Sequence, residues 1–312
     1  MTRLTRIAAV VALGTITLGF AACGGKDELP KVTAEAPKAA TPFASGPLIV
    51  TGVEYAFGVE GQPVPGIQTI TFRNAGKEYH ELQLVSLDPG YALADAQKIL
   101  TTPGASIPDW VKFSGGIWAI PAGAQGTMTA KLSAGSYAVL CLLEDSNRPW
   151  SQTSWRAGEG SKRAPHFARG MVNTFEVKGT EVKDAAPTAT LSVESSDYAF
   201  RAPSEATAGT TTISLKNNSK EPHFAGLVRV PDGVTYEAFT AVLLAPLPST
   251  DQAVAVAVAA GVSGGVGGVS AGGQAWITTQ LRSGTYVIVC LIPDVRGVPH
   301  AALGMLNKLT VK

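Results

Sequence analysis

The chain has 312 residues, of which 45% are hydrophobic and 16% are charged, and its formal net charge is +1. This length accommodates two domains with cores of their own, and the composition is that of a folded chain rather than a disordered one. The near-neutral charge argues against nucleic acid as a partner. The 34 Gly and 20 Pro residues favour a turn-rich β protein.

Residues 1–22 have the layout of a removable export signal. Two arginines precede a short apolar run, residues 7–20, and small residues lead up to Cys23. The pattern resembles the lipobox of bacterial lipoproteins, although Phe20 stands where Leu is usual. The resemblance implies a lipid anchor on Cys23 and a location on the periplasmic side of the bacterial cell envelope. The alternative is an ordinary signal peptide whose cleavage leaves a Cys.

Residues 23–47 are rich in Ala, Pro, Lys and Glu and show no sustained periodicity. This composition is typical of a linker, so we expect a flexible tether there. After the tether we expect a first domain over residues 48–178, an interdomain linker over 179–187 and a second domain over 188–312.

The first domain is expected to be built of short strands, because β-branched and aromatic residues alternate with polar ones between turn-forming clusters. The expected elements are strands at Leu48–Phe57, Gln68–Arg73 and Glu81–Leu87, a helix at Tyr91–Leu100, a hairpin of Gly126–Leu132 with Gly135–Leu143 about Ser133–Ala134, and a closing strand at Gly170–Lys178. The strand at Glu81 follows directly on His80, which places that imidazole at the mouth of a strand.

The second domain repeats this pattern. Its expected elements are strands at Thr190–Phe200, Thr210–Lys216, Phe224–Val230, Gln274–Leu281, Gly284–Leu291 and Gly304–Lys312, and a helix at Tyr236–Leu244. The stretch Ala253–Gly273 is nearly all Ala, Val and Gly, and we expect a flexible or loosely packed connection there. Short strands without βαβ alternation predict an all-β fold of two tandem Greek-key β-sandwich domains, each with one short helix.

Two sets of residues with metal-binding side chains recur at matching positions. The first set is His80, Cys141, His166 and Met171, and the second is His223, Cys290, His300 and Met305. The first His residues of the two sets are 143 positions apart, and so are the Tyr-Ala-Phe motifs that precede them. All four His of the chain belong to these sets, whereas scattered core residues would not recur in this way.

One Cys and two His supply strong bonds that copper favours, and a Met adds a weak axial contact, as in blue-copper electron-transfer sites. With these residues the two repeats resemble cupredoxins of the plastocyanin and azurin kind over residues 48–312. In that family one His comes from the end of an early strand, and Cys, His and Met come from the loop between the last two strands. The resemblance implies a cupredoxin fold, one or two bound copper ions and both sets as ligands.

The spacing between Cys and the second His departs from the tight loop of small blue-copper proteins. Nine residues intervene in the second set and twenty-four in the first. Closing a longer loop costs slowly rising entropy, so the His can still return to the site, although site two is the better candidate and site one could be altered or empty. The longer loop could face a redox partner or be a solvated insertion. Its aromatic and basic residues are Trp150, Trp155, Arg148, Arg156, Lys162 and Arg163.

The expected function is electron transfer with a partner protein, without a small-molecule substrate and without enzymatic activity. An oxidase with a trinuclear copper cluster would need His-x-His pairs and His beside the Cys, and the sequence has neither. A hydrolase lacks a Ser-His-Asp constellation outside the copper positions.

Three alternatives stay open. The chain could buffer or deliver copper in the periplasm, although the Met-rich or His-rich tracts that would favour this role are missing. It could be a metal-free structural or interaction β-sandwich in which Cys and Met simply pack as hydrophobic residues. Finally, Cys141 and Cys290 could form an interdomain disulfide, because the expected compartment is oxidising.

Overall fold

The computed structural model describes residues 47–100, 102, 107–143, 165–244, 262–296 and 298–312. The predicted export signal, Cys23 and nearly all of the predicted tether lie outside these residues. So do residues 144–164, which hold the tryptophans and the basic residues of the longer loop. Residues 42–312 group as one compact unit. In the part of the chain that is described, no helix is long and apolar enough to cross a membrane.

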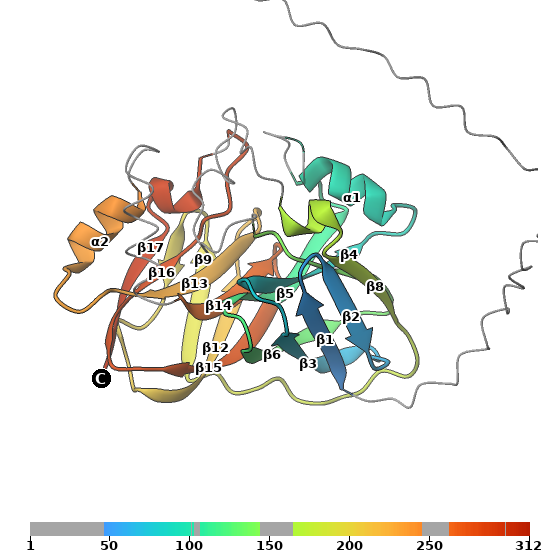
Figure 1. Ribbon diagram of the computed structural model, residues 1–312, viewed down its shortest axis with the longest axis horizontal. Coiled ribbons are helices and arrows are strands. Elements are labelled where there is room, and N and C mark those ends of the chain that lie inside the picture. The colour runs from blue at the N-terminus through green and yellow to red at the C-terminus, as the bar shows by residue number, and fades with distance from the viewer. Residues whose placement is uncertain (1–46, 101, 103–106, 144–164, 245–261, 297) are drawn as a thin grey trace, which may run out of the picture. The chain divides into compact units, whose positions relative to one another are not determined.

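The first half of the described chain is mainly strands (Figure 1). Its elements are β1 (Leu48–Val53), β2 (Ala56–Glu60), β3 (Gly66–Asn74), β4 (His80–Leu87), α1 (Leu93–Leu100), β5 (Val111–Ile120), β6 (Gln125–Leu132), β7 (Gly135–Leu140), the 3-10 helix η1 (His166–Arg169) and β8 (Val172–Val177). Residues alternate between buried and more exposed positions along β1, as expected of a strand with one face on the core.

The second half repeats these elements. They are β9 (Leu191–Ser196), β10 (Ala199–Arg201), β11 (Glu205–Ala206), β12 (Gly209–Asn217), β13 (His223–Arg229), α2 (Tyr236–Leu243), β14 (Val262–Val269), β15 (Gln274–Leu281), β16 (Gly284–Val289), the 3-10 helix η3 (His300–Leu303) and β17 (Leu306–Val311). The expectation of an all-β fold is confirmed, and the described part of each half contains one short α-helix.

Two predicted strands are each divided by a tight turn. The strand predicted at Leu48–Phe57 becomes β1 and β2, and that at Thr190–Phe200 becomes β9 and β10. At these turns Tyr55 has φ 60° and Asp197 has φ 47°, the left-handed conformation that a continuous strand does not contain. Each turn folds its second strand back antiparallel to its first.

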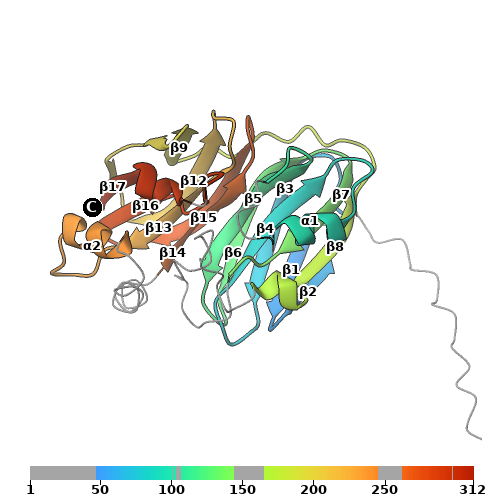
Figure 2. The ribbon, with the colours of Figure 1, turned by 90° about the horizontal axis from the view of Figure 1, so that it is seen from above.

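The strands form two sheets, and both halves of the chain contribute to each sheet (Figures 1 and 2). One sheet has the order β10-β9-β12-β15-β6-β3-β1-β2, and the other has β11-β17-β16-β13-β14-β5-β4-β7-β8. The halves therefore join edge to edge, through antiparallel pairing of β15 with β6 and of β14 with β5. This pairing covers strand edges that would otherwise offer free hydrogen-bonding groups. The predicted domain boundaries stay predictions.

The predicted hairpin of residues 126–143 is wrong in its pairing. β6 pairs with β3 and β15 in one sheet, whereas β7 pairs with β4 and β8 in the other. The turn at Ser133–Ala134 therefore carries the chain from one sheet to the other. The hydroxyl of Tyr137 accepts a hydrogen bond from the Ser133 backbone N–H at 3.0 Å and fixes this crossing. The hydroxyl of Tyr286 does the same for Arg282 in the second half, at 3.1 Å.

The expectation of a flexible connection at Ala253–Gly273 is also wrong where the structure describes it, because residues 262–269 form the interior strand β14. Its glycines allow three backbones to approach closely. A Cβ atom on Gly267 would lie 2.6 Å from the Cα atom of Gly116 in β5, and one on Gly265 would lie 2.7 Å from the Cα atom of Gly226 in β13. Glycine weakens a strand in general, but here no other residue fits.

Two buried side chains cross the junction between the halves. The amide of Gln83 bonds to Gly268 in both directions, as donor to the carbonyl at 3.1 Å and as acceptor from the N–H at 2.6 Å. The ring of Trp118, from β5, lies against Phe224 with ring centroids 5.5 Å apart. The two halves are therefore joined by core packing as well as by backbone pairing.

Candidate metal centres

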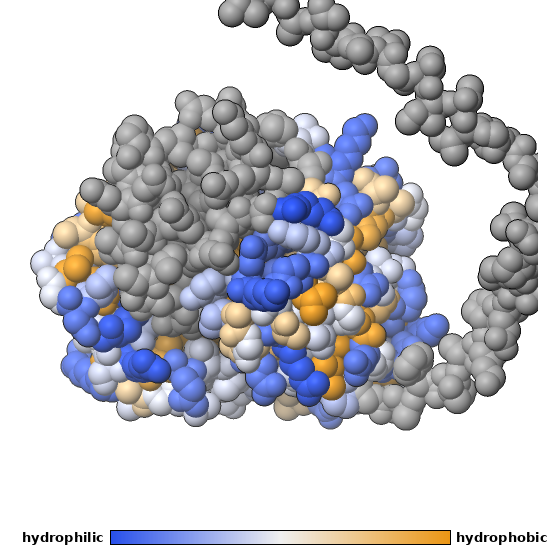
Figure 3. Space-filling model, viewed as in Figure 1, coloured by the Kyte–Doolittle hydropathy of each residue, from blue (hydrophilic) through white to orange (hydrophobic). Residues whose placement is uncertain are grey.

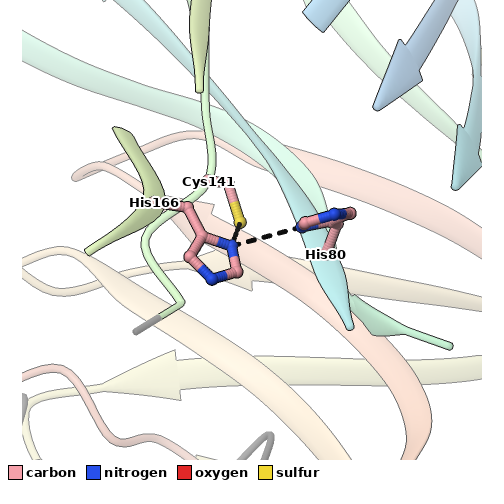
Figure 4. A group of neighbouring side chains, drawn as sticks. All are labelled: His80, Cys141 and His166. Carbon is pink, nitrogen blue, oxygen red and sulfur yellow. Dashed lines mark hydrogen bonds between the residues drawn. The ribbon is translucent and has the colours of Figure 1, made fainter. Parts of the chain in front are cut away.

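The first candidate centre brings together the side chains of His80, Cys141 and His166, all fully buried (Figure 4). His80 begins β4, Cys141 follows β7 and His166 begins η1. The Nδ1 atoms of the two imidazoles are 3.2 Å apart, and the Cys141 Sγ atom is 3.4 Å from Nδ1 of His166. Three donor atoms from distant parts of the sequence thus converge on one point.

The second candidate centre has the same construction. The Nδ1 atoms of His223 and His300 are 3.0 Å apart, and Sγ of Cys290 lies 3.8 Å from the first and 3.6 Å from the second. All three side chains are fully buried. The donor atoms are as close together in site one as in site two. These distances therefore do not support the sequence-based expectation that site one would be less well formed.

The donor separations fit a shared metal ion. Donor atoms that lie about 2.0–2.3 Å from one ion are roughly 3.3–3.8 Å from one another, which is close to the separations found here. One thiol and two imidazoles are also a donor set that copper favours. The residues present therefore fit copper, and Cys141 and Cys290 are free thiols rather than partners in a disulfide.

Each predicted Met is tied by its backbone to the other residues of its set. The Met171 N–H donates to the His166 carbonyl at 2.9 Å, and its own carbonyl accepts from the Cys141 N–H at 3.3 Å. Met305 makes the same two bonds, at 3.0 and 3.3 Å, in the second centre. Both Met side chains are fully buried. The structure therefore places each Met beside its centre, and its role as an axial ligand stays a prediction.

The Cys sulfur in each centre also receives a backbone N–H. The donor is Glu81 for Cys141 and Phe224 for Cys290, each at 3.5 Å. In both halves the strand register shifts directly after the first His, so the next N–H points to the sulfur instead of continuing the strand pairing. Such a bond stabilises negative charge on sulfur, which a thiolate ligand carries.

The loops that return the second His close in the same way despite their different lengths. In site two the His300 N–H donates to the Ile292 carbonyl at 2.9 Å, and Asp294 accepts bonds inside the nine-residue loop. In site one the His166 N–H donates to the Leu143 carbonyl at 2.8 Å. In both sites the second His is therefore bonded to the residue two positions after the Cys, whatever the length of the loop between them.

Burial favours the uncharged forms of the Cys thiols and of the imidazoles of the second centre before a metal binds. It raises the pKa of the Cys290 thiol to about 12 and raises the pKa of Cys141 well above its usual value. Burial also lowers the pKa of His223 to about 3 and that of His300 to about 4. At neutral pH the second centre therefore offers two neutral imidazoles and a protonated thiol, and an entering cation would release the thiol proton.

Three pairs of neighbouring residues were missed by sequence reasoning. Glu78 and Glu221 lie beside the second imidazoles, and the rings of Tyr55 and Tyr198 pack on them. Their signal in the sequence is the repeated Glu-x-His and Tyr-Ala-Phe motifs.

The third pair makes the two centres differ. Glu81 in site one occupies the position that Phe224 has in site two. Burial raises the pKa of the Glu81 carboxyl to about 7, and this carboxyl accepts the Leu142 N–H at 2.8 Å.

Several solved structures of copper proteins are similar to the chain. A reduced auracyanin from Roseiflexus castenholzii is 18% identical, covers 42% of this chain and 95% of its own, and has a TM-score of 0.28. Auracyanin A from Chloroflexus aurantiacus, described as a blue copper protein, is 24% identical, covers 39% and 98%, and has a TM-score of 0.26. A copper nitrite reductase from Nitrosomonas europaea is 14% identical, covers 86% and 94%, and has a TM-score of 0.24.

No protein-family model matches the sequence, and no curated protein matches it significantly. The similar structures include an enzyme as well as small copper proteins. These likenesses are too weak to assign a function, which has to be argued from the two centres themselves.

Proposed function

We propose that this chain is a copper-binding electron-transfer protein with type 1 (blue) copper centres. The observation that carries the proposal is the duplicated, fully buried cluster of one thiol and two imidazoles, at donor separations suited to one ion. Bound copper would supply a one-electron redox couple. His80, Cys141, His166 and Met171 would hold it in site one, and His223, Cys290, His300 and Met305 would do so in site two.

The surrounding residues favour electron transfer because they fix the ligands before copper binds. The second imidazole, the Cys and the Met are joined by backbone hydrogen bonds, so the ligand positions do not depend on the metal. A preformed ligand set changes little between the two oxidation states. Full burial of the donors keeps water away from the centre, and the N–H bonds to sulfur stabilise the thiolate.

We propose further that the protein works outside the cytoplasm, in the bacterial cell envelope, held to the membrane by a lipid on Cys23. The support is the sequence of residues 1–23 alone. Its substrate would be the electron of a redox partner protein rather than a small molecule. Cys23→Ser should abolish incorporation of labelled palmitate and release the protein from the membrane fraction. Retention in the membrane without Cys23 would contradict the anchor.

The function itself is tested by redox cycling of the copper-loaded protein. We expect each bound copper ion to accept one electron from ascorbate and return it to ferricyanide over repeated cycles, without loss of metal. Copper that binds but is released on oxidation or reduction would instead favour buffering or delivery. A protein that binds no copper would be a metal-free pair of sandwiches.

A further inference from the structure

The second imidazole of each centre presents its other ring nitrogen to a carboxylate. In site two, Nδ1 of His300 faces the donor cluster, so Nε2 lies on the far side of the ring. That Nε2 atom is buried and lies 3.2 Å from the Oε2 atom of Glu221. This oxygen atom is buried as well. In site one, Nε2 of His166 lies 3.4 Å from Oε2 of Glu78. The same pair of atoms therefore meets in both halves of the chain.

The position of each carboxylate is built into the fold. Asn217 donates its side-chain amide to the Glu221 carbonyl at 2.7 Å and to the Val269 carbonyl of β14 at 2.8 Å. Asn74 makes the equivalent bonds, at 2.8 Å to the Glu78 carbonyl and at 2.9 Å to that of Ile120 in β5. Both Asn side chains are buried. The backbone of each Glu is thus anchored to the strand beside its centre, and this places its partly exposed side chain next to the imidazole.

The ring above each pair limits where the imidazole can turn. Tyr198 packs on His300 with ring centroids 4.9 Å apart, and its hydroxyl is 3.5 Å from the other carboxylate oxygen of Glu221. Tyr55 packs on His166 with centroids 5.4 Å apart. Each imidazole therefore has an aromatic ring packed against it and a carboxylate next to its Nε2 atom.

The chemistry of this contact selects one tautomer. A neutral imidazole carries a single N–H, on either Nδ1 or Nε2, and an ionised carboxylate can only accept a hydrogen bond. A carboxylate next to Nε2 favours the proton there and leaves the Nδ1 lone pair free for the donor cluster. With the proton on Nδ1 instead, Nε2 and the carboxylate would face each other without a proton between them.

We propose that Glu78 and Glu221 are positioning residues that hold His166 and His300 in the Nε2-protonated tautomer, with Nδ1 directed to the metal. The importance of this role for copper binding rests on the proposed function. The tautomer itself is a property of the metal-free chain. In each repeat the His of the Glu-x-His motif would thus be the first His ligand, and the Glu of the same motif would orient the second His ligand.

The test compares Glu221→Ala and Glu221→Gln with a control, Glu205→Gln, in the full-length chain. Glu205 is exposed and pairs with Lys312 at 2.6 Å, so its change removes a carboxylate without touching a centre. The first readout is the ¹⁵N chemical shifts of the His300 ring in the metal-free protein at neutral pH. We expect the Nε2-protonated form in the parent chain, in Glu205→Gln and in Glu221→Gln, whose amide oxygen still accepts. Glu221→Ala should show a mixture of tautomers.

The second readout is Cu(I) affinity, measured for the same variants by competition with a chromophoric chelator. We expect Glu221→Ala to weaken binding at site two by roughly 10–100-fold and Glu221→Gln to recover most of the loss. An unchanged tautomer in Glu221→Ala, or an affinity equal to that of Glu205→Gln, would overturn the inference. If the parent chain bound no copper, the proposed function would fail, while the tautomer measurement would still decide this inference.

Discussion

The junction between the two halves should depend strongly on the ring of Trp118. This ring leaves β5, crosses β14 and reaches Phe224 and Gly226 of β13, where it fills the space above a glycine. Trp118 is only 6% exposed, and the strands around it are fixed by pairing, so they cannot collapse into the space that its removal leaves. Trp118→Ala should therefore cost about 3–5 kcal/mol in the free energy of unfolding.

For a chain of this size, such a loss corresponds to a fall in melting temperature of about 2–4 °C for each kcal/mol. The assay is urea and thermal unfolding of the metal-free protein, followed by circular dichroism. The control is Tyr91→Ala, which likewise removes an aromatic ring. The Tyr91 ring stacks on Trp110, but the residue is 48% exposed. The reasoning would be refuted if Trp118→Ala were no more destabilising than Tyr91→Ala.

Gly267→Ala should destabilise the fold by about 1–3 kcal/mol, because its new methyl group meets the backbone of β5, whereas Gly58→Ala, in an open strand position, should change stability by less than about 0.5 kcal/mol. Equal effects in urea unfolding would contradict the close approach of the strands. In the metal-free protein, His223 and His300 have pKa values lowered to about 3 and about 4, so below pH 6.5 they stay neutral in the folded state while the unfolded state gains protons. As the pH falls from 6.5 toward 4, each of these His residues should lower the free energy of unfolding by up to about 1.4 kcal/mol per pH unit. Glu81, with its pKa raised to about 7, has the opposite effect between pH 7 and pH 4.5, and this effect is absent in Glu81→Gln. Stability that did not fall in Glu81→Gln between pH 6.5 and pH 4 would contradict the burial of the two imidazoles as neutral groups.

The ligand sets were readable in the sequence because their residue types are rare and occur twice. Four His in the whole chain, two in each repeat at matching positions, leave few other interpretations. The structure brings three members of each set to one point and places the fourth beside it. Met128, the remaining Met after the initial one, is fully buried in β6, where it faces Ile277 of β15 across the junction.

The junction was only partly predictable, because two of its four strands, β5 and β14, lack the usual sequence signals of a strand. β5 and β14 contain adjacent glycines, and glycine normally marks a turn or a flexible segment. These glycines are required because the backbone of the neighbouring strand lies too close for a side chain. That contact exists only when the two halves pair. The false hairpin has a related cause, because a turn that links two strands of one sheet and a turn that crosses between sheets have similar sequences.

The carboxylates beside the second imidazoles illustrate another limit. A Glu next to Lys in a loop, as in Lys77-Glu78 and Lys220-Glu221, is usually a solvated surface residue. Its contact with an imidazole far away in the sequence depends on the return path of the ligand loop, which no local pattern describes.

The hydropathy of the surface gives no comparable guide to a partner. On the face shown in Figure 3, hydrophilic and hydrophobic residues are interspersed. The large hydrophobic side chains that are exposed among the described residues are Val53, Tyr91, Val234 and Val295. They come from separate parts of the sequence.

The central claim, that each half holds copper through its Cys thiolate, is tested most directly by visible absorption during Cu(II) titration of the full-length protein. We expect an intense thiolate-to-copper band that saturates at two equivalents. Cys141→Ser and Cys290→Ser should each remove one equivalent and their part of the band, and the double variant should be colourless. A band that survives in the double variant, or copper that binds without any such band in the parent protein, would show that the Cys thiolates do not hold the copper.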